Sequence, residues 1–194
     1  ARRQALAEEI DRLENFSDAL EDAASAERSA REALETAAAE LSETRAAAGA
    51  ALAERVQSVL AELAMPHARI AVGISRRATP TVHGFDDVEL RFSANAGEEL
   101  APLRKVASGG ELSRLMLAIK TVLIATDPVP TYIFDEIDTG IGGATAEVVG
   151  RLLARVAAHR QVLCITHLPQ IAAYGDQHAR VTKSVVDERT VSRF

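Results

Sequence analysis

The segment Thr131–Phe134 constrains the fold of this chain more than any other part of the sequence. It is a short apolar run that follows Pro128 and Pro130 and ends in two acids, Asp135 and Glu136. Such a run is too short for a lone helix and predicts a buried strand of a parallel sheet. Both carboxylates then lie at the carboxyl end of the strand, where open α/β sheets bind their ligands.

The strand and its two acids resemble a Walker B element. In that interpretation Asp135 binds Mg²⁺, directly or through water. Glu136 orients or deprotonates the water that attacks the γ-phosphate of a bound nucleotide. The alternative is an acidic strand end that faces solvent, so the rest of the sequence has to decide between the two.

A second motif lies at Ser108–Glu111, where Ser108 and Glu111 have the spacing of a capping box. The apolar positions of the helix that it predicts are Leu112, Leu115, Ile119 and Val122. Gly109 and Gly110 weaken a helix start, by up to about 1 kcal/mol each in a helix interior, and therefore need another reason. Without side chains they let backbone N–H groups approach an anion, and we expect a phosphate. The alternative is a plain capped helix.

With the preceding Val106–Ala107, this motif resembles the signature sequence of ABC-type ATPases. The resemblance implies that Ser108, Gly109, Gly110 and Glu111 form a cofactor-binding segment. In that family the serine and glycines contact the γ-phosphate of ATP bound to the opposing subunit. Asp138, in the turn after the Walker B strand, stands at the position of the D-loop, which lies beside the partner's nucleotide.

Strand, helix and strand follow one another from Thr131 to Thr166, with the helix expected over 144–158 and the second strand over 161–166. A unit of this length makes the two strands parallel and brings their carboxyl ends to one edge. We therefore expect His167 to lie beside Asp135 and Glu136. It resembles the switch histidine of ABC-type ATPases, which contacts the γ-phosphate, although a lone histidine is more often structural.

Residues 1–64 contain no proline and one glycine and have the composition of a long helix. Its apolar positions recur at spacings of three, four and seven and predict a coiled-coil seam. They are Leu6, Ile10, Leu13, Leu20, Leu34, Leu41, Ala48, Leu52, Val56 and Val59. A bend or break at Asn15–Ser17 or Gly49 stays open, as does a helix packed along a globular domain.

Pro66 ends the helical pattern. Alternating residues over 69–74 and 88–92 predict a small antiparallel β segment, with turns at Thr79–Pro80 and His83–Gly84.

The net charge of -6 belongs to the first third of the chain. Residues 1–64 carry 7 basic and 14 acidic side chains, which leaves 15 basic and 14 acidic for the remainder. Composition therefore gives no direct support for a DNA-binding surface. A single cysteine, Cys164, argues against a disulfide framework, and no stretch reaches the length of a membrane span. Because the chain begins with Ala and stops within a strand-like pattern, we expect a fragment.

Together these motifs resemble the bacterial RecN family of SMC-like DNA repair ATPases, from about residue 41 to the end. The segments that carry the resemblance are Ala64–His67, Lys105–Arg114, Phe134–Ile141 and Thr166–Gln170. Gly142 departs from the serine expected in many relatives, and Ala172–Asp176 varies a less constrained turn.

The resemblance implies an α/β fold: the carboxyl-terminal lobe of an ABC/SMC-type ATPase head over 65–194, with a parallel sheet flanked by helices, preceded by a coiled-coil helix over 1–64. It implies ATP and Mg²⁺ as cofactors and DNA and a second head as partners. It further implies a cytoplasmic, nucleoid-associated protein of double-strand break repair and recombination, with no membrane partner. No G-x-x-x-x-G-K-[ST] occurs in the sequence, so an amino-terminal P-loop lobe of the same protein is required, and this chain alone is expected to be inactive.

Three alternatives share some of these features. A transporter nucleotide-binding domain has the same motifs but not usually a long coil before the signature. The intact acids and histidine argue against a structural coiled-coil module that has lost ATPase activity, and the P-loop lobe would decide this alternative. Other SMC-like proteins are the nearest competitors and are separated by the Met65–His67 and Leu168–Gln170 segments.

Overall fold

A computed structural model describes residues 2–106, 108–186 and 189–193. The chain divides into two compact units. One comprises residues 1–48 and 74–88, and the other comprises residues 49–73 and 89–194. The long helix and the first two strands contribute to both, and each unit is described by itself below.

The helix α1 (Arg2–Glu62) is uninterrupted. It continues through Asn15–Ser17 and Gly49, the two places where the sequence left a bend or break open. A Cβ at Gly49 would lie 2.9 Å from the Cβ of Val72. The missing side chain therefore lets the strand β1 (Arg69–Thr81) pack directly on the helix.

The carboxyl end of α1 is set by a left-handed residue. Ala64 has a φ of 58°, and the N–H of Met65 donates to the carbonyl of Leu60 at 3.0 Å. This is the geometry with which helices commonly end. Pro66 follows and cannot continue the helix.

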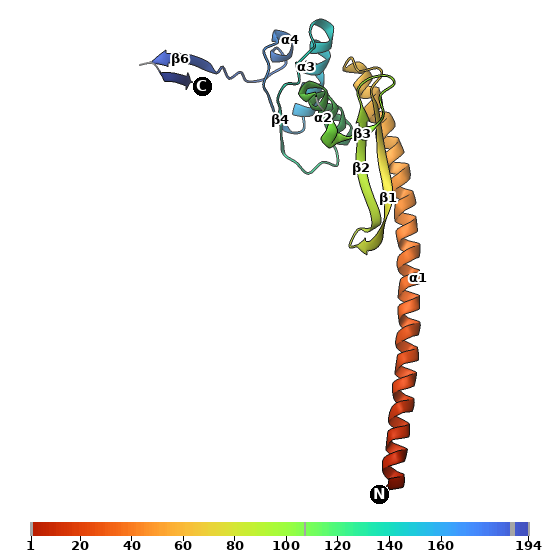
Figure 1. The fold of residues 1–194 in the computed structure, drawn as a ribbon. Helices are drawn as coiled ribbons and strands as arrows, with labels where there is room; N and C mark the ends of the chain where they lie inside the picture. Colours follow the sequence, from red (N-terminus) through yellow and green to blue (C-terminus); the bar gives the residue numbers. More distant parts are fainter. Residues whose placement is uncertain (1, 107, 187–188, 194) are drawn as a thin grey trace. The chain divides into compact units, whose positions relative to one another are not determined.

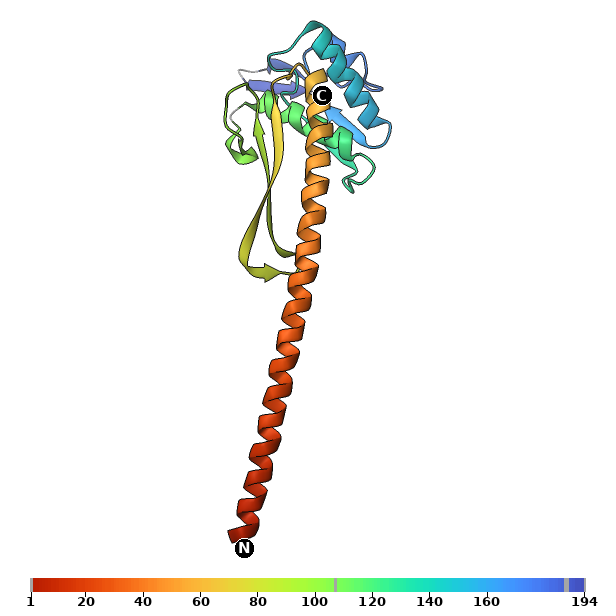
Figure 2. The same ribbon diagram turned by 90° about the vertical axis from the view of Figure 1, so that its right-hand side faces the viewer.

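In the first unit a β-hairpin lies along α1, as both views show (Figures 1 and 2). Its strands are β1 and β2 (Gly84–Ser93). Arg45 pairs with Asp86 at 2.8 Å, and the guanidinium of Arg76 lies 4.1 Å from the centre of the Phe85 ring. The cation–π contact joins the two strands of the hairpin to each other. Arg76 also pairs with Glu35 of α1 at 2.5 Å, so two ion pairs attach the hairpin to the helix.

The predicted turn at Thr79–Pro80 is wrong, because β1 continues through both residues. The chain reverses at Val82–His83, next to the second predicted turn at His83–Gly84, helped by Gly84 with a φ of 85°. Thr81 Oγ1 accepts the N–H of His83 and donates to the Gly84 carbonyl. Proline is tolerated at a strand position whose N–H needs no partner.

The second unit contains the remaining elements. They are β3 (Ala101–Pro102), the 3-10 helix η1 (Leu103–Lys105), α2 (Gly109–Leu123), β4 (Thr131–Phe134), α3 (Gly143–Ala157), β5 (Gln161–Cys164), α4 (Pro169–Ala172), β6 (Thr182–Val186) and β7 (Arg189–Arg193). The first sheet has the order β1-β2-β3, with β3 antiparallel to β2, and β6 pairs antiparallel with β7. β4 and β5 are parallel, in register from Thr131 opposite Gln161 to Phe134 opposite Cys164. The predicted α/β fold, with a parallel sheet and a small antiparallel β segment, is confirmed.

The core of this unit joins the end of α1 to α2, α3 and β4. Its fully buried side chains include Val56, Leu60, Leu63, Leu115, Leu117, Ile137, Leu152, Val149 and Val156. Val56 belongs to the seam predicted for a partner helix, yet here it is packed inside the chain's own globular unit. The sequence left open a helix packed along a globular domain, and the last turns of α1 are packed in this way.

The sheet of β4 and β5 is covered on one face only among the described residues. Tyr132 and Phe134 are buried in the core, whereas Ile133, Leu163 and Ile165 are 69%, 46% and 60% exposed. Parallel sheets are usually covered on both faces. No helix in the described part of the chain is long and apolar enough to cross a membrane.

Val149→Ala tests this core. The two methyl groups it removes are worth about 0.8 kcal/mol each, with a further cost for the cavity, so we expect the free energy of unfolding to fall by about 1–3 kcal/mol. Val82→Ala is the matched control: Val82 is 95% exposed, and its loss should cost less than about 0.5 kcal/mol. Urea unfolding followed by circular dichroism measures both, and equal losses would contradict the assigned core.

Candidate functional site

The parallel pairing of β4 with β5 brings two loops to one edge of the sheet. The register ends at Phe134 and Cys164, and the N–H of Ile165 still donates to the Phe134 carbonyl at 2.9 Å. The acidic segment 135–138 and the segment 165–167 therefore leave the sheet side by side. This edge is where the sequence placed its candidate catalytic residues.

His167 meets the acidic segment through Asp138. Its Nδ1 lies 3.0 Å from Asp138 Oδ2, and its backbone N–H donates to the same oxygen at 2.9 Å. Thr166 Oγ1 donates to that oxygen at 2.6 Å. The sequence pattern placed His167 beside Asp135 and Glu136, and the structure shows its direct contact with a third acid of the same loop, Asp138.

The side chain of Asp138 is buried, although the residue was expected to bind the cofactor. Its side chain is 6% exposed, while that of His167 is 78% exposed. The carboxylate is directed toward Thr166 and His167. Burial alone would raise the pKa of Asp138, but the hydrogen bonds from Thr166 and the His167 N–H, together with the nearby imidazole, lower it below its ordinary value.

Ser108 caps α2 as predicted. Its Oγ accepts the N–H of Glu111 at 3.4 Å, so one of the orphan donors of the first turn is satisfied. Beyond the cap, Ser113 Oγ donates to the Asp135 carbonyl at 2.6 Å. The predicted signature helix is therefore bonded directly to the loop that follows β4.

Arg114 strengthens this attachment from inside the chain. It is 8% exposed, and its Nη1 donates to the carbonyls of Thr139 at 2.9 Å and Ile137 at 3.5 Å. Burial lowers the pKa of the guanidinium, partly offset by the charge of Glu111. A charged donor bonded to the carbonyls on either side of Asp138 fixes the backbone that carries this carboxylate.

Contacts within the chain explain why glycine stands at positions 109 and 110. A Cβ at Gly109 would lie 1.9 Å from Glu136 Oε2, and one at Gly110 would lie 3.0 Å from Thr139 Cβ and 3.1 Å from the Thr139 carbonyl oxygen. The sequence pattern attributed both glycines to an external phosphate. The structure shows that they also allow the start of α2 to contact the acidic loop.

Glu136 has a constrained backbone. Its φ is 57°, in the left-handed region that costs a non-glycine residue of order 1–3 kcal/mol. Its N–H donates to Asp135 Oδ1 at 2.9 Å, and its carbonyl accepts the N–H of Thr139 at 3.1 Å. Such strain is concentrated at functional sites and is held here by these local bonds.

The donor set fits a nucleotide-bound magnesium ion better than a metal held by protein alone. Among the described residues, no group of three or more His, Cys, Asp or Glu side chains could bind a metal. Mg²⁺ usually takes one or two carboxylates and completes its shell with phosphate and water. Asp135, exposed at the end of β4, can supply one such carboxylate. The Glu136 carboxylate, an anion, already lies against the amino end of α2 in front of Gly109, which shows that this end accommodates negative charge.

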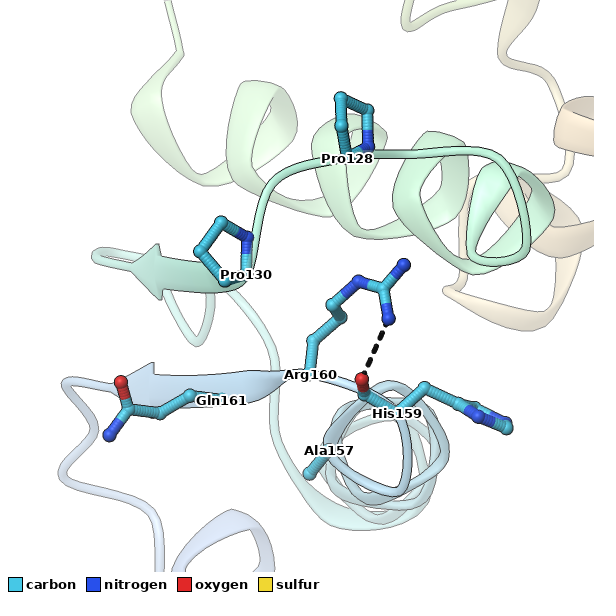
Figure 3. Close-up of a pocket in the computed structure, with 6 residues that line it drawn as sticks. All are labelled: Pro128, Pro130, Ala157, His159, Arg160 and Gln161. Carbon is cyan, nitrogen blue, oxygen red and sulfur yellow. Dashed lines mark hydrogen bonds between the residues drawn. The ribbon is translucent and has the colours of Figure 1, made fainter.

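A pocket at the opposite edge of the sheet is not this site. It is lined by Pro128, Pro130, Ala157, His159, Arg160 and Gln161 (Figure 3). These residues surround the amino-terminal ends of β4 and β5, whereas the acids follow the carboxyl ends. Arg160 bonds the carbonyls of His159, Asp127 and Ile124 there, a structural use of its guanidinium.

The sequence analysis missed four residues of this edge: Ser113, Arg114, Thr139 and Thr166. All four lie within or next to the motifs that it identified. Their position beside a motif was the signal in the sequence that they could belong to the site. Their hydrogen-bond partners could not be predicted, because these lie 22 to 28 residues away in the chain. Cys164 packs partly buried against the core, and burial raises the pKa of its thiol to about 11.

Comparison with known proteins defines first the class and then the family. The fold is that of an SMC head domain: the chain matches the Smc head domain with a coiled coil and joint from Pyrococcus yayanosii, with a TM-score of 0.50 and 22% identity, over 73% of this chain and 26% of that one. No family model matches the sequence.

Sequence relatives identify the family. The chain is 55% identical over 141 residues, 73% of its length, to the DNA repair protein RecN of Deinococcus radiodurans. It is 39% identical over 194 residues, 99% of its length, to RecN of Xylella fastidiosa. The chain belongs to the RecN family of DNA repair proteins. It spans 25% and 35% of the length of these two relatives.

Gly110→Ala tests the contact between α2 and the acidic loop. The new Cβ would meet backbone atoms of Thr139 and Glu136 at 3.1–3.2 Å, and overpacking of this kind costs about 1–3 kcal/mol. That exceeds any gain from replacing glycine in the first turn of a helix, so the melting temperature should fall. Gly73→Ala is the control, because its Cβ would meet only ordinary van der Waals contacts of 3.5 Å or more. An unchanged melting temperature for Gly110→Ala would contradict the close approach.

Proposed function

We propose that this chain forms the carboxyl-terminal lobe of the ATP-hydrolysing head of a RecN-type DNA repair protein. One observation carries the proposal. The end of β4, the amino end of α2 and His167 are bonded to one another at a single edge of the sheet, through Ser113, Arg114 and Asp138. Family membership supports an ATPase of DNA repair, and the site residues supply the chemistry.

In the proposed reaction, Asp135 is a ligand of the Mg²⁺ that accompanies ATP, and Glu136 orients or deprotonates the attacking water. Bound Mg²⁺ neutralises charge that develops on the phosphates. His167, exposed and anchored at its Nδ1 side, contacts the γ-phosphate. The family resemblance assigns these roles. The three residues could perform them together because they follow strands that end at the same edge of the sheet.

An amino-terminal P-loop lobe of the same protein completes the proposed nucleotide site. The chain covers 25% and 35% of two relatives and contains no phosphate-cradling G-x-x-x-x-G-K-[ST]. The exposed face of Ile133, Leu163 and Ile165 is an apolar surface next to the site, and the P-loop lobe is its proposed cover. Without that lobe, the chain would bind ATP poorly and have no activity.

A second head is the proposed partner across the nucleotide. Ser108, Gly109, Gly110 and Glu111 would contact ATP bound to the other head of a homodimer, so that ATP binding joins the heads and hydrolysis separates them. For Gly109 to do so, the Glu136 carboxylate has to leave the position that it occupies here. In the proposed cycle, the contact of Gly109 with ATP of the other head is therefore linked to the displacement of the Glu136 carboxylate.

DNA is the proposed substrate of the whole protein, tethered through head dimerisation and coiled coils during double-strand break repair and recombination. The exposed apolar side chains of α1 support a partner helix: Leu6, Ile10, Phe16 and Leu20 are 58%, 54%, 67% and 61% exposed. The proposed location of the whole protein is the cytoplasm, in association with the nucleoid.

Glu136→Gln in the full-length protein tests the function. We expect ATP binding and the ATP-dependent dimer to persist while turnover falls by about 10²–10⁴, the range for a lost general base. Turnover is measured by phosphate release, and binding with a fluorescent ATP analogue. Glu147→Gln, the same change at an exposed position of α3, is the control. Wild-type turnover in Glu136→Gln would remove this residue from the reaction.

Ser108→Arg tests the second head. A long cationic side chain at the start of α2 should block ATP-dependent dimerisation and leave ATP binding by the monomer intact, as measured by size-exclusion chromatography with light scattering. Ser108→Ala removes the cap, worth about 1 kcal/mol, without adding bulk. Ser58→Arg introduces the same side chain at an exposed position of α1. An unimpaired dimer in Ser108→Arg would contradict the signature assignment.

A further inference from the structure

One carboxylate oxygen at the edge of the sheet contacts three groups of the loop after β5. Asp138 Oδ2 accepts from Thr166 Oγ1 at 2.6 Å and from the His167 N–H at 2.9 Å, and it lies 3.0 Å from His167 Nδ1. The side chain of Asp138 is 6% exposed, and that of His167 is 78% exposed. A buried anion thus contacts one side of a ring whose remaining surface faces outward.

The chemistry of the ring follows from this contact. An unprotonated Nδ1 would direct a lone pair at a carboxylate oxygen, which is repulsive, so the proton of the neutral imidazole resides on Nδ1. Nε2 is then the ring nitrogen directed away from Asp138. A carboxylate that fixes tautomer and orientation in this way commonly supports a functional histidine.

The carboxylate is itself held in place. Arg114 donates to the carbonyls of Ile137 and Thr139, the residues on either side of Asp138. Because Arg114 belongs to α2, the position of His167 is connected to the helix that begins with Ser108. The backbone on either side of the acid that contacts the ring is therefore bonded to the helix that Ser108 caps.

We propose that Asp138 is the positioning residue for His167: it fixes the proton on Nδ1 and directs Nε2 toward the γ-phosphate. The inference rests on the proposed function and departs from the direct nucleotide contact expected for Asp138. Asp138 acts on the reaction only through the ring of His167. Its removal should have no effect once that ring is gone.

A double-mutant cycle in the full-length protein tests this. His167→Gln is measured first for turnover at saturating ATP. Asp138→Asn keeps an oxygen for Thr166 and the backbone N–H but removes the charge opposite Nδ1, and we expect turnover to fall by about 10- to 100-fold, the range for a group that orients a functional histidine. The combined variant should be no slower than His167→Gln alone. ATP affinity and melting temperature are measured for each variant.

Each outcome has a separate meaning. Multiplicative losses in the combined variant, or full turnover in Asp138→Asn, would overturn the positioning role and leave the function intact. Full turnover in His167→Gln would overturn the assignment of His167 itself, before Asp138 is examined. Thr166→Val controls for a structural effect, since it removes another contact of the same oxygen and leaves the ring contact. A loss equal to that of Asp138→Asn would count against the inference, and a smaller loss would support it.

Discussion

The parallel pairing of β4 with β5 is the constraint on which the rest of the site depends. Antiparallel strands would place the residues after Phe134 and those after Cys164 at opposite edges of the sheet. The parallel register places them at the same edge, where Asp138 can reach Thr166 and His167. The intervening helix α3 makes this possible, because a parallel connection needs a crossover of about a dozen residues or more. Val149 and Val156, fully buried in α3, pack that crossover into the core.

A second set of contacts makes the edge a single unit. Ser113 and Arg114 bond the backbone of the acidic loop from α2, and the two glycines before them allow the helix to lie close enough for these bonds. The left-handed Glu136 is the conformational cost of this arrangement. The loop is held at both Asp135 and Thr139, which stabilises the left-handed backbone of Glu136 between them.

Local signals in the sequence were sufficient for the elements but not for their contacts. The strand 131–134, the cap at Ser108 and the helix of α3 follow from short apolar patterns and capping chemistry, and all three were predictable. The turn predicted at His83–Gly84 lies next to the observed reversal at Val82–His83. The continuation of β1 through Pro80 was not predictable, because the hydrogen bonds of Thr81 that favour the later turn form only in the hairpin. The contact between Asp138 and His167 joins residues 29 apart, and no local rule selects Asp138 over Asp135 or Glu136 as the partner of the ring.

The difference between Glu136 and Asp138 explains why one short loop carries three acids. Asp138 is buried and paired, so its charge acts inward on one ring. Glu136 is exposed, and its carboxylate rests against the glycine at the start of α2, a position favoured by the helix dipole. An incoming phosphate would compete for that same helix end, since both are anions and Gly109 leaves room for one. In the proposed cycle, arrival of a nucleotide at α2 would therefore release the Glu136 side chain, whereas Asp138, bonded to Thr166 and the backbone of His167, would keep its contacts.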